Sequence, residues 1–146
     1  MTQENKDLLL KDLCGRLPYG VKCEHMNWNM KVQDYVTMIS VLCGITRDTP
    51  IFEYVDGEEV FICESEFDIC HIKPYLYPLS SMTEEQKKEY DSIIYHNVEL
   101  HWERYYDVID VDWYEILHDF YNKNHFDYRG LIPMGLANDA TGLNIY

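Results

Sequence analysis

The dipeptide Asp56-Gly57 is the sequence feature that most constrains the fold. It separates two short runs rich in β-branched and aromatic residues, 51–55 and 59–63. Asp-Gly favours the backbone conformations of a two-residue hairpin turn, so the two runs are predicted to pair as antiparallel strands. Further strands are needed, because an isolated hairpin is only marginally stable in water.

Three other segments are predicted to supply those strands. Residues 21–26 alternate apolar and polar side chains, which indicates a half-buried strand, and residues 35–42 are β-branched and aromatic, which indicates a more buried one. A last strand is expected near residues 69–76, at an edge or ending early because of Pro74 and Pro78. Together they predict a small curled antiparallel sheet. It is either a closed SH3-like barrel or an open meander packed on the first helix.

Helical periodicity flanks the predicted strands on both sides. Leucines at helical spacing predict a helix over residues 2–14, ended by Gly15. After residue 80, Thr83 and Gln86 form a capping box, and a final helix is expected from the capping pair Asp112 and Glu115. Residues 95–110 fit either a strand or a continued helix. The tail after residue 130 is expected to be irregular, with a mobile end.

These patterns predict an α+β fold with an N-terminal helix, a small sheet and C-terminal helices. A chain of 146 residues suits a single domain. We expect residues 1–79 to form the helix and sheet core, and residues 80–146 to form a helical C-terminal layer and tail.

The formal charge of −14 is concentrated in two blocks. Residues 50–70 contain seven carboxylates and no lysine or arginine, and residues 99–119 contain seven carboxylates and one arginine. Such a balance disfavours nucleic acid and anionic membranes and favours basic protein partners, although it also serves solubility alone. If the blocks share one face, the predicted binding residues are Glu53, Asp56, Glu58, Glu59, Glu64, Glu66, Asp68, Glu103, Asp107 and Asp110.

A second candidate site would bind a small molecule of the nucleotide type. Phosphates require cations, and those expected to converge with aromatic groups are Arg16, Lys73, His125, Tyr128 and Arg129. His125 follows a helix C-terminus, where the helix dipole would help it hold its proton. The interpretation we prefer for residues 125–132 is a packed turn. In it, Phe126 and Leu131 are anchors and Arg129 pairs with an acidic neighbour.

Catalytic and metal signatures are weak in this sequence. No Cys-x-x-Cys pair occurs, His96 and His101 are five residues apart, and Cys70 and His71 are adjacent, so they would point to opposite faces of a strand. No phosphate-binding glycine loop or nucleophile elbow is present. We therefore expect no metal, no cofactor and no catalytic residue. A divergent hydrolase that uses scattered carboxylates is the remaining enzymatic alternative.

The cysteines and the N-terminus indicate a compartment. Five scattered cysteines, an odd number, suit a reducing cytoplasm better than a disulfide framework. Residues 1–7 lack the basic and apolar regions of a signal peptide, and the longest mostly apolar stretch, 35–45, is too short to span a bilayer. The expected location is the cytoplasm. The oligomeric state is left open by these patterns.

Three segments carry a resemblance to a known family: LPYGVK at 17–22, IKPYLYPLSSMTEE at 72–85 and NKNHFDYRGLI at 122–132. In that order they resemble a family of small uncharacterised proteins of anaerobic gut bacteria and their prophages and phages. The resemblance implies a phage-associated or mobile-element role and carries no activity or site residue. The function expected from the sequence is a non-enzymatic acidic protein that binds a basic protein.

Overall fold

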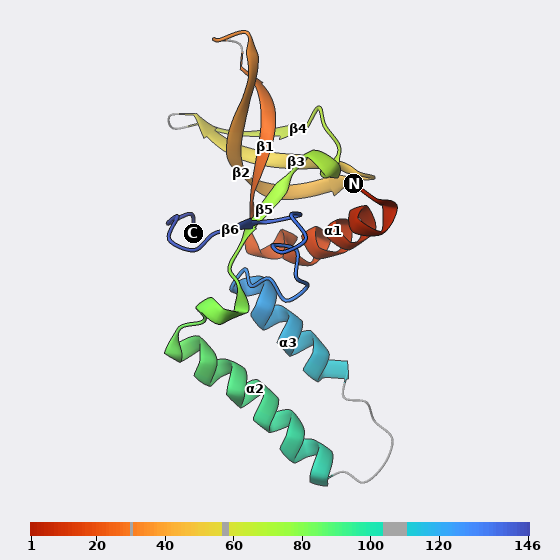
Figure 1. The fold of residues 1–146 in the computed structure, drawn as a ribbon, viewed down its shortest axis with the longest axis vertical. Coiled ribbons are helices and arrows are strands. Elements are labelled where there is room, and N and C mark those ends of the chain that lie inside the picture. Colours follow the sequence, from red (N-terminus) through yellow and green to blue (C-terminus); the bar gives the residue numbers. More distant parts are fainter. Residues whose placement is uncertain (30, 57–58, 104–110) are drawn as a thin grey trace.

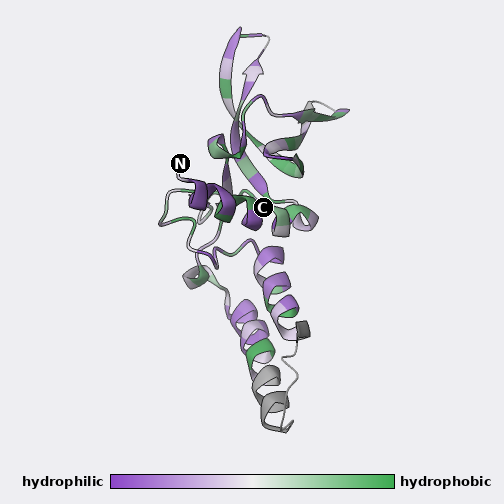
Figure 2. Ribbon diagram, turned by 90° about the vertical axis from the view of Figure 1, so that its right-hand side faces the viewer, coloured by the Kyte–Doolittle hydropathy of each residue, from purple (hydrophilic) through white to green (hydrophobic). Residues whose placement is uncertain are grey.

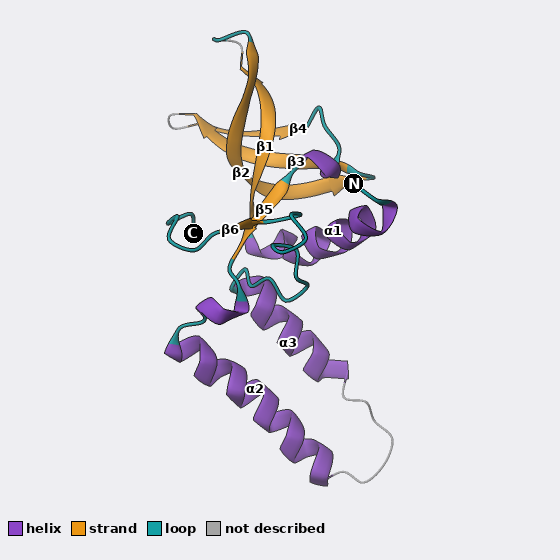
Figure 3. Ribbon diagram, in the orientation of Figure 1, coloured by secondary structure: helices purple, strands orange, loops and turns teal. Residues whose placement is uncertain are grey.

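The computed structural model describes residues 1–29, 31–56, 59–103 and 111–146. Along the chain (Figure 1), helices and strands follow the order α1 (Gln3–Arg16), β1 (Lys22–Asn29), β2 (Asp34–Thr46), β3 (Thr49–Asp56), β4 (Glu59–Glu64), β5 (Lys73–Leu76), α2 (Glu84–Glu103), α3 (Val111–Lys123) and β6 (Asn138–Asp139). Strands gather at one end of the molecule and α2 and α3 at the other (Figure 3). The predicted α+β class is confirmed.

The six strands form one open sheet in the order β4-β3-β2-β1-β5-β6. All neighbouring pairs are antiparallel except β5 and β6, which are parallel. Because β4 and β6 are the two edges, the SH3-like barrel is wrong and the open sheet is correct. The predicted hairpin is present, since β3 and β4 pair up to Asp56 and Glu59. The last antiparallel strand is shorter than predicted, because residues 69–71 form a 3-10 turn.

Helix α1 covers one face of this sheet. Its N-terminus is capped by Thr2, whose hydroxyl accepts the amide of Asn5 at 3.2 Å. Leu9 and Leu13 are fully buried against Leu42 of β2 and Phe52 of β3 in the main core. Alternate residues of the strands supply this core, as a period of two requires. The predicted helix is confirmed, but it continues through Gly15 and ends at Arg16.

Helices α2 and α3 form an antiparallel pair that extends away from the sheet (Figure 1). The predicted capping box is present: the Thr83 amide donates to Gln86 Oε1 at 2.9 Å, and the Gln86 amide donates to Thr83 Oγ1 at 3.2 Å. The ambiguous segment continues α2 as a helix to Glu103. The predicted cap at Asp112 lies outside the described side chains. A second core between the helices includes Leu117, Phe120 and Phe126.

The segment after α3 returns to the sheet. Leu131, Leu136 and Ala137 are buried in the main core, and the amide of Ala140 donates to the carbonyl of Leu76 at 2.8 Å. Most of this tail is irregular, as predicted, but β6 belongs to the sheet. The tail was expected to end loosely. In the structure, the Tyr146 hydroxyl donates to the carbonyl of Tyr75 at 2.8 Å, which joins the last residue of the tail to β5.

The sheet forks between β2 and β3. These strands pair only from Val41 opposite Glu53 to the turn, whereas β2 continues beside β1 as far as Asp34. Beyond Val41, the strands of the β1–β2 hairpin and those of the β3–β4 hairpin diverge and run in different directions in both views (Figures 1 and 2).

Candidate binding surface

The sheet face turned away from α1, called the outer face here, exposes several large apolar side chains. Residues opposite each other in a ladder share a side, so the register places these side chains on the same side of their ladders, on two hairpins that diverge beyond Val41. On the β1–β2 hairpin, Ile39 is 48% exposed, and on the β3–β4 hairpin, Ile62 is 68% exposed. The set comprises Met26, Trp28, Tyr35, Ile39, Val60 and Ile62. Met26, Trp28, Tyr35 and Ile39 are neighbours on the β1–β2 ladder, and such a group of exposed apolar side chains is typical of interaction surfaces.

A cleft of about 470 Å³ lies where the fork opens. Residues 38–41 of β2 form one side, Glu53 and Tyr54 of β3 form the other, and Lys22 and Ile145 also line it. The Lys22 ammonium donates to the carbonyl of Ile145 at 2.6 Å, which fixes its position and leaves its positive charge in the cleft. Glu53 contributes a carboxylate to the same cleft, whose other lining residues are mostly apolar.

The first acidic block lies on the β3–β4 hairpin and the loop after it, residues 49–56 and 59–68, which we call the acidic arm. Glu59, Glu64 and Glu66 are exposed there, and Glu66 accepts the Tyr35 hydroxyl at 2.6 Å. Asp68 instead accepts from the Lys6 ammonium at 3.2 Å and so helps to fix α1 to the loop. The side chain of Asp56 and all of Glu58 lie outside the described residues.

The structure does not bring the second acidic block to the first. Helix α2 ends at Glu103, and Figure 1 shows this end of α2 at the opposite end of the molecule from β3 and β4. Asp107 and Asp110 lie outside the described residues. A single acidic face built from both blocks is thus not formed by the members that the structure describes. The blocks separate because α2 and α3 carry the second block away from the sheet.

Four of the five residues in the alternative ligand site do converge, but in the interior. Arg16 is fully buried and donates to Asp12 through Nε at 2.6 Å and through Nη2 at 3.1 Å. Arg129 Nε lies 3.3 Å from Asp12 Oδ1. Both guanidinium groups lie over the Tyr128 ring, at 5.5 and 4.7 Å from its centroid. We call Asp12, Arg16, Tyr128 and Arg129 the Asp12 cluster.

This cluster joins α1 to the segment after α3. Arg16 Nη2 also donates to the carbonyl of Phe126 at 2.8 Å, and Phe126 and Leu131 are almost completely buried. The packed-turn interpretation of residues 125–132 is therefore confirmed, with Asp12 as the acidic partner of Arg129. Lys73 lies apart, exposed at the start of β5 and opposite Glu24 of β1. The cations that a phosphate would need are occupied by Asp12.

His125 is buried beside the Asp12 cluster and stacks on Tyr146, with ring centroids 3.8 Å apart. Burial, together with the positive charges of Arg16 and Lys22, lowers its pKa from 6.5 to about 4. The expectation that the helix end would help His125 hold its proton is wrong. Loss of hydration and nearby cations outweigh a helix dipole, whose effect is small and local.

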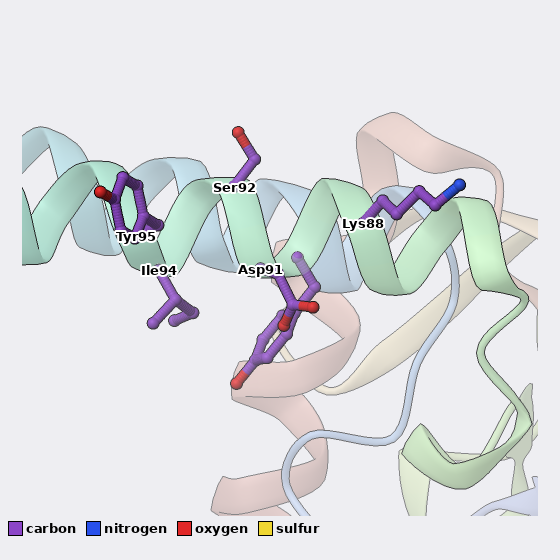
Figure 4. A pocket seen from close by; sticks show the side chains of 6 residues that line it. Lys88, Asp91, Ser92, Ile94 and Tyr95 are labelled. Carbon is purple, nitrogen blue, oxygen red and sulfur yellow. The ribbon is translucent and has the colours of Figure 1, made fainter.

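A shallow hollow of about 590 Å³ lies along α2. Its lining residues all belong to this one helix, and Figure 4 shows Lys88 and Ser92 pointing away from Asp91 and Ile94. Binding sites for small molecules need polar groups that converge from several elements. The hollow lacks that convergence, so the fork remains the better candidate.

Two further properties concern metals and membranes. In the part of the chain that the structure describes, no group of three or more His, Cys, Asp or Glu side chains is placed to hold a metal ion. Among the same residues, no helix is both long and apolar enough to cross a membrane.

Comparisons with protein families, with curated proteins and with solved structures find no match. The resemblance of residues 17–22, 72–85 and 122–132 to a phage and gut-bacterial family therefore stays a prediction. The binding surface has to be interpreted from its own chemistry.

The sequence interpretation missed the apolar part of this surface. Residues 35–42 were expected to form a mostly buried strand, yet Tyr35, Thr37 and Ile39 are exposed, whereas Ser40 and Leu42 are buried. The apolar residues at successive positions of 35–42 indicated that both faces of this strand are largely apolar. They could not show that α1 covers only one of those faces and that β3 diverges from β2.

Proposed function

We propose that this chain is a non-enzymatic binding protein that engages a basic segment of another protein through the outer face and the acidic arm. The observation that carries the proposal is the set of exposed apolar side chains that includes Ile39 and Ile62. Ile62 belongs to the β3–β4 hairpin, whose sequence has carboxylates and no lysine or arginine. Apolar contact supplies binding free energy, and charge complementarity supplies steering and partner selection.

The acidic arm favours a basic protein over other partners. Its sequence range, residues 50–70, has a net charge of −7, so a polyanion would be repelled. Exposed Glu59 and Glu64 flank the apolar residues of β4, which suits a partner in which lysine or arginine alternates with aliphatic residues. A nucleotide site at the Asp12 cluster is less well supported, because both of its arginines already contact Asp12 and Arg16 is fully buried.

Selection from a random dodecapeptide library displayed on phage, against the immobilised protein, tests the proposal. Enriched peptides are expected to combine Lys or Arg with aliphatic residues. Their affinity, measured by fluorescence anisotropy, should fall by about tenfold or more between 50 and 300 mM salt because screening weakens steering and attraction.

Two double variants distinguish the effect of the acidic arm on peptide binding from the effect of the total charge of the protein. Glu59→Gln with Glu64→Gln removes two carboxylates from the arm, and Glu85→Gln with Glu89→Gln removes two exposed carboxylates from α2. The first should weaken the selected peptides several-fold, and the second should leave them unchanged. Enriched peptides without a basic bias, or equal effects of the two variants, would contradict the proposal.

A further inference from the structure

The edge of β2 that faces the fork carries free backbone groups. The Leu42 amide donates to the carbonyl of Val21 at 2.9 Å, so the backbone amide and carbonyl of Leu42 point towards β1. In an antiparallel strand, the amide and carbonyl of one residue point to the same side, and successive residues alternate. Ile39 and Thr37 therefore direct their amides and carbonyls away from β1, into the fork.

No strand in the described residues pairs with this stretch of β2 on the fork side. The β2–β3 ladder stops at Val41, and the β1–β2 register runs without a shift to Asp34. The Tyr35 amide is already taken, because it donates to the Asp34 carboxylate at 2.8 Å. Thr37 and Ile39 are left with two amides that can donate, and two carbonyls that can accept, hydrogen bonds from a new strand.

We propose that the basic segment adds to the β2 edge as an extended strand, hydrogen-bonded to Thr37 and Ile39. This inference rests on the proposed function and names the conformation in which the partner binds. Edge addition of this kind takes affinity from backbone hydrogen bonds and specificity from alternate side chains. Here, alternate side chains of the added segment would lie on the outer face beside Ile39. A lysine or arginine of the segment would pair with Glu53 across the cleft.

Charge decides between a partner segment and a second copy of this chain. Pairing two β2 edges would bring two acidic arms together, each from a sequence range of net charge −7. Like charges at an interface cost several kcal/mol. A basic extended segment has the opposite charge and needs only one free edge, so it is the occupant to which the geometry points.

The first test uses backbone methylation of a selected dodecapeptide, so it does not depend on the folding of any variant. Each residue is N-methylated in turn, and binding is measured by fluorescence anisotropy. An added strand presents every second amide to β2. Methylation should therefore weaken binding by about tenfold or more at two alternate positions and much less at the position between them.

The second test is made on the protein. Thr37→Pro removes an amide that does not bond to β1, which is the position in a strand where proline is tolerated. Peptide binding should fall by about tenfold, whereas Thr37→Val, which keeps the amide, should bind like the wild type. Circular dichroism and the urea midpoint check that both variants are folded. Amide exchange on the wild type should show Thr37 and Ile39 becoming protected by the peptide, whether or not the proline variant folds.

The outcomes separate the two proposals. If no basic peptide binds, the proposed function fails. If basic peptides bind but methylation has no alternating effect and Thr37 and Ile39 gain no protection, strand addition fails and the proposed function stands. If light scattering shows a dimer that Thr37→Pro dissociates, the occupant is a second copy and the partner named here is wrong.

Discussion

The Asp12 cluster and the acidic arm use charge in opposite ways. In the cluster, one carboxylate is fully buried and is contacted by two guanidinium groups. In the arm, Glu59 and Glu64 are exposed, and the sequence from 50 to 70 contains no lysine or arginine. Buried charges must be paired to be tolerated, whereas exposed charges affect solubility and encounter more than stability. The cluster therefore belongs to folding, and the arm is available for recognition.

The largest effect on stability is expected from Asp12→Asn. It would leave Arg16 buried without its counter-ion, which should lower the free energy of unfolding by about 3–5 kcal/mol. Urea unfolding followed by tryptophan fluorescence measures this loss. The control is Glu84→Gln, which removes an exposed ion pair with Lys87 and should cost less than about 1 kcal/mol. Equal losses in the two variants would remove the distinction between buried and exposed charge.

A pH-dependent effect is expected at His125. The folded protein keeps His125 neutral down to about pH 4, but the unfolded chain takes up this proton near pH 6.5. The stability due to His125 is therefore complete above pH 6.5 and is lost as the pH falls towards 4. The loss should reach about 3 kcal/mol.

Urea unfolding at pH 7 and pH 4 measures the His125 effect. In His125→Asn, which suits the left-handed backbone at φ 55°, that part of the pH dependence should disappear. Identical pH profiles for wild type and His125→Asn would contradict the buried, cation-flanked description of this histidine.

A smaller effect is expected from Tyr146→Phe. The Tyr146 hydroxyl accepts from the Lys22 amide at 3.0 Å and donates to the Tyr75 carbonyl at 2.8 Å, so it links β1 and β5 to the tail. Its removal should lower the free energy of unfolding by about 1–2 kcal/mol. Thermal and urea unfolding measure this change. Tyr114→Phe, at a tyrosine 53% exposed on α3, serves as the control and should have a smaller effect.

The smallest effect on stability is expected in the acidic arm. Glu59→Gln with Glu64→Gln changes two exposed side chains and should shift the free energy of unfolding by less than about 0.5 kcal/mol. The same variant is expected to weaken basic peptides, so stability and binding are measured side by side. A large loss of stability here would mean that the arm also supports the fold.

Local patterns were sufficient for most of the elements. The leucine spacing predicted α1, Asp56-Gly57 predicted the β3–β4 hairpin, and Thr83 with Gln86 predicted the start of α2. Each of these signals acts within a few residues, where backbone geometry and capping dominate. The packed turn anchored by Phe126 and Leu131 was likewise predicted correctly, because two large apolar residues flank its polar groups.

The candidate site was predictable only in part. The sequence identified the carboxylates of the acidic arm, but it grouped them with Glu103, which lies at the far end of the molecule. It also missed Ile39 and Ile62, because an apolar residue in a strand is normally assigned to the core. Which face of a strand stays uncovered depends on the path of the other elements, and no local pattern contains that path.

Residue order alone determined the periods, the turns, the caps and a charge of −14. Tertiary structure decided that the sheet is open and forked, that Arg16 and Arg129 meet at Asp12, and that the two acidic blocks are separate. The physical reason is range. Spacing and capping act over a few residues, whereas the pairing of Arg129 with Asp12 and the end of the β2–β3 ladder at Val41 depend on how the whole chain packs.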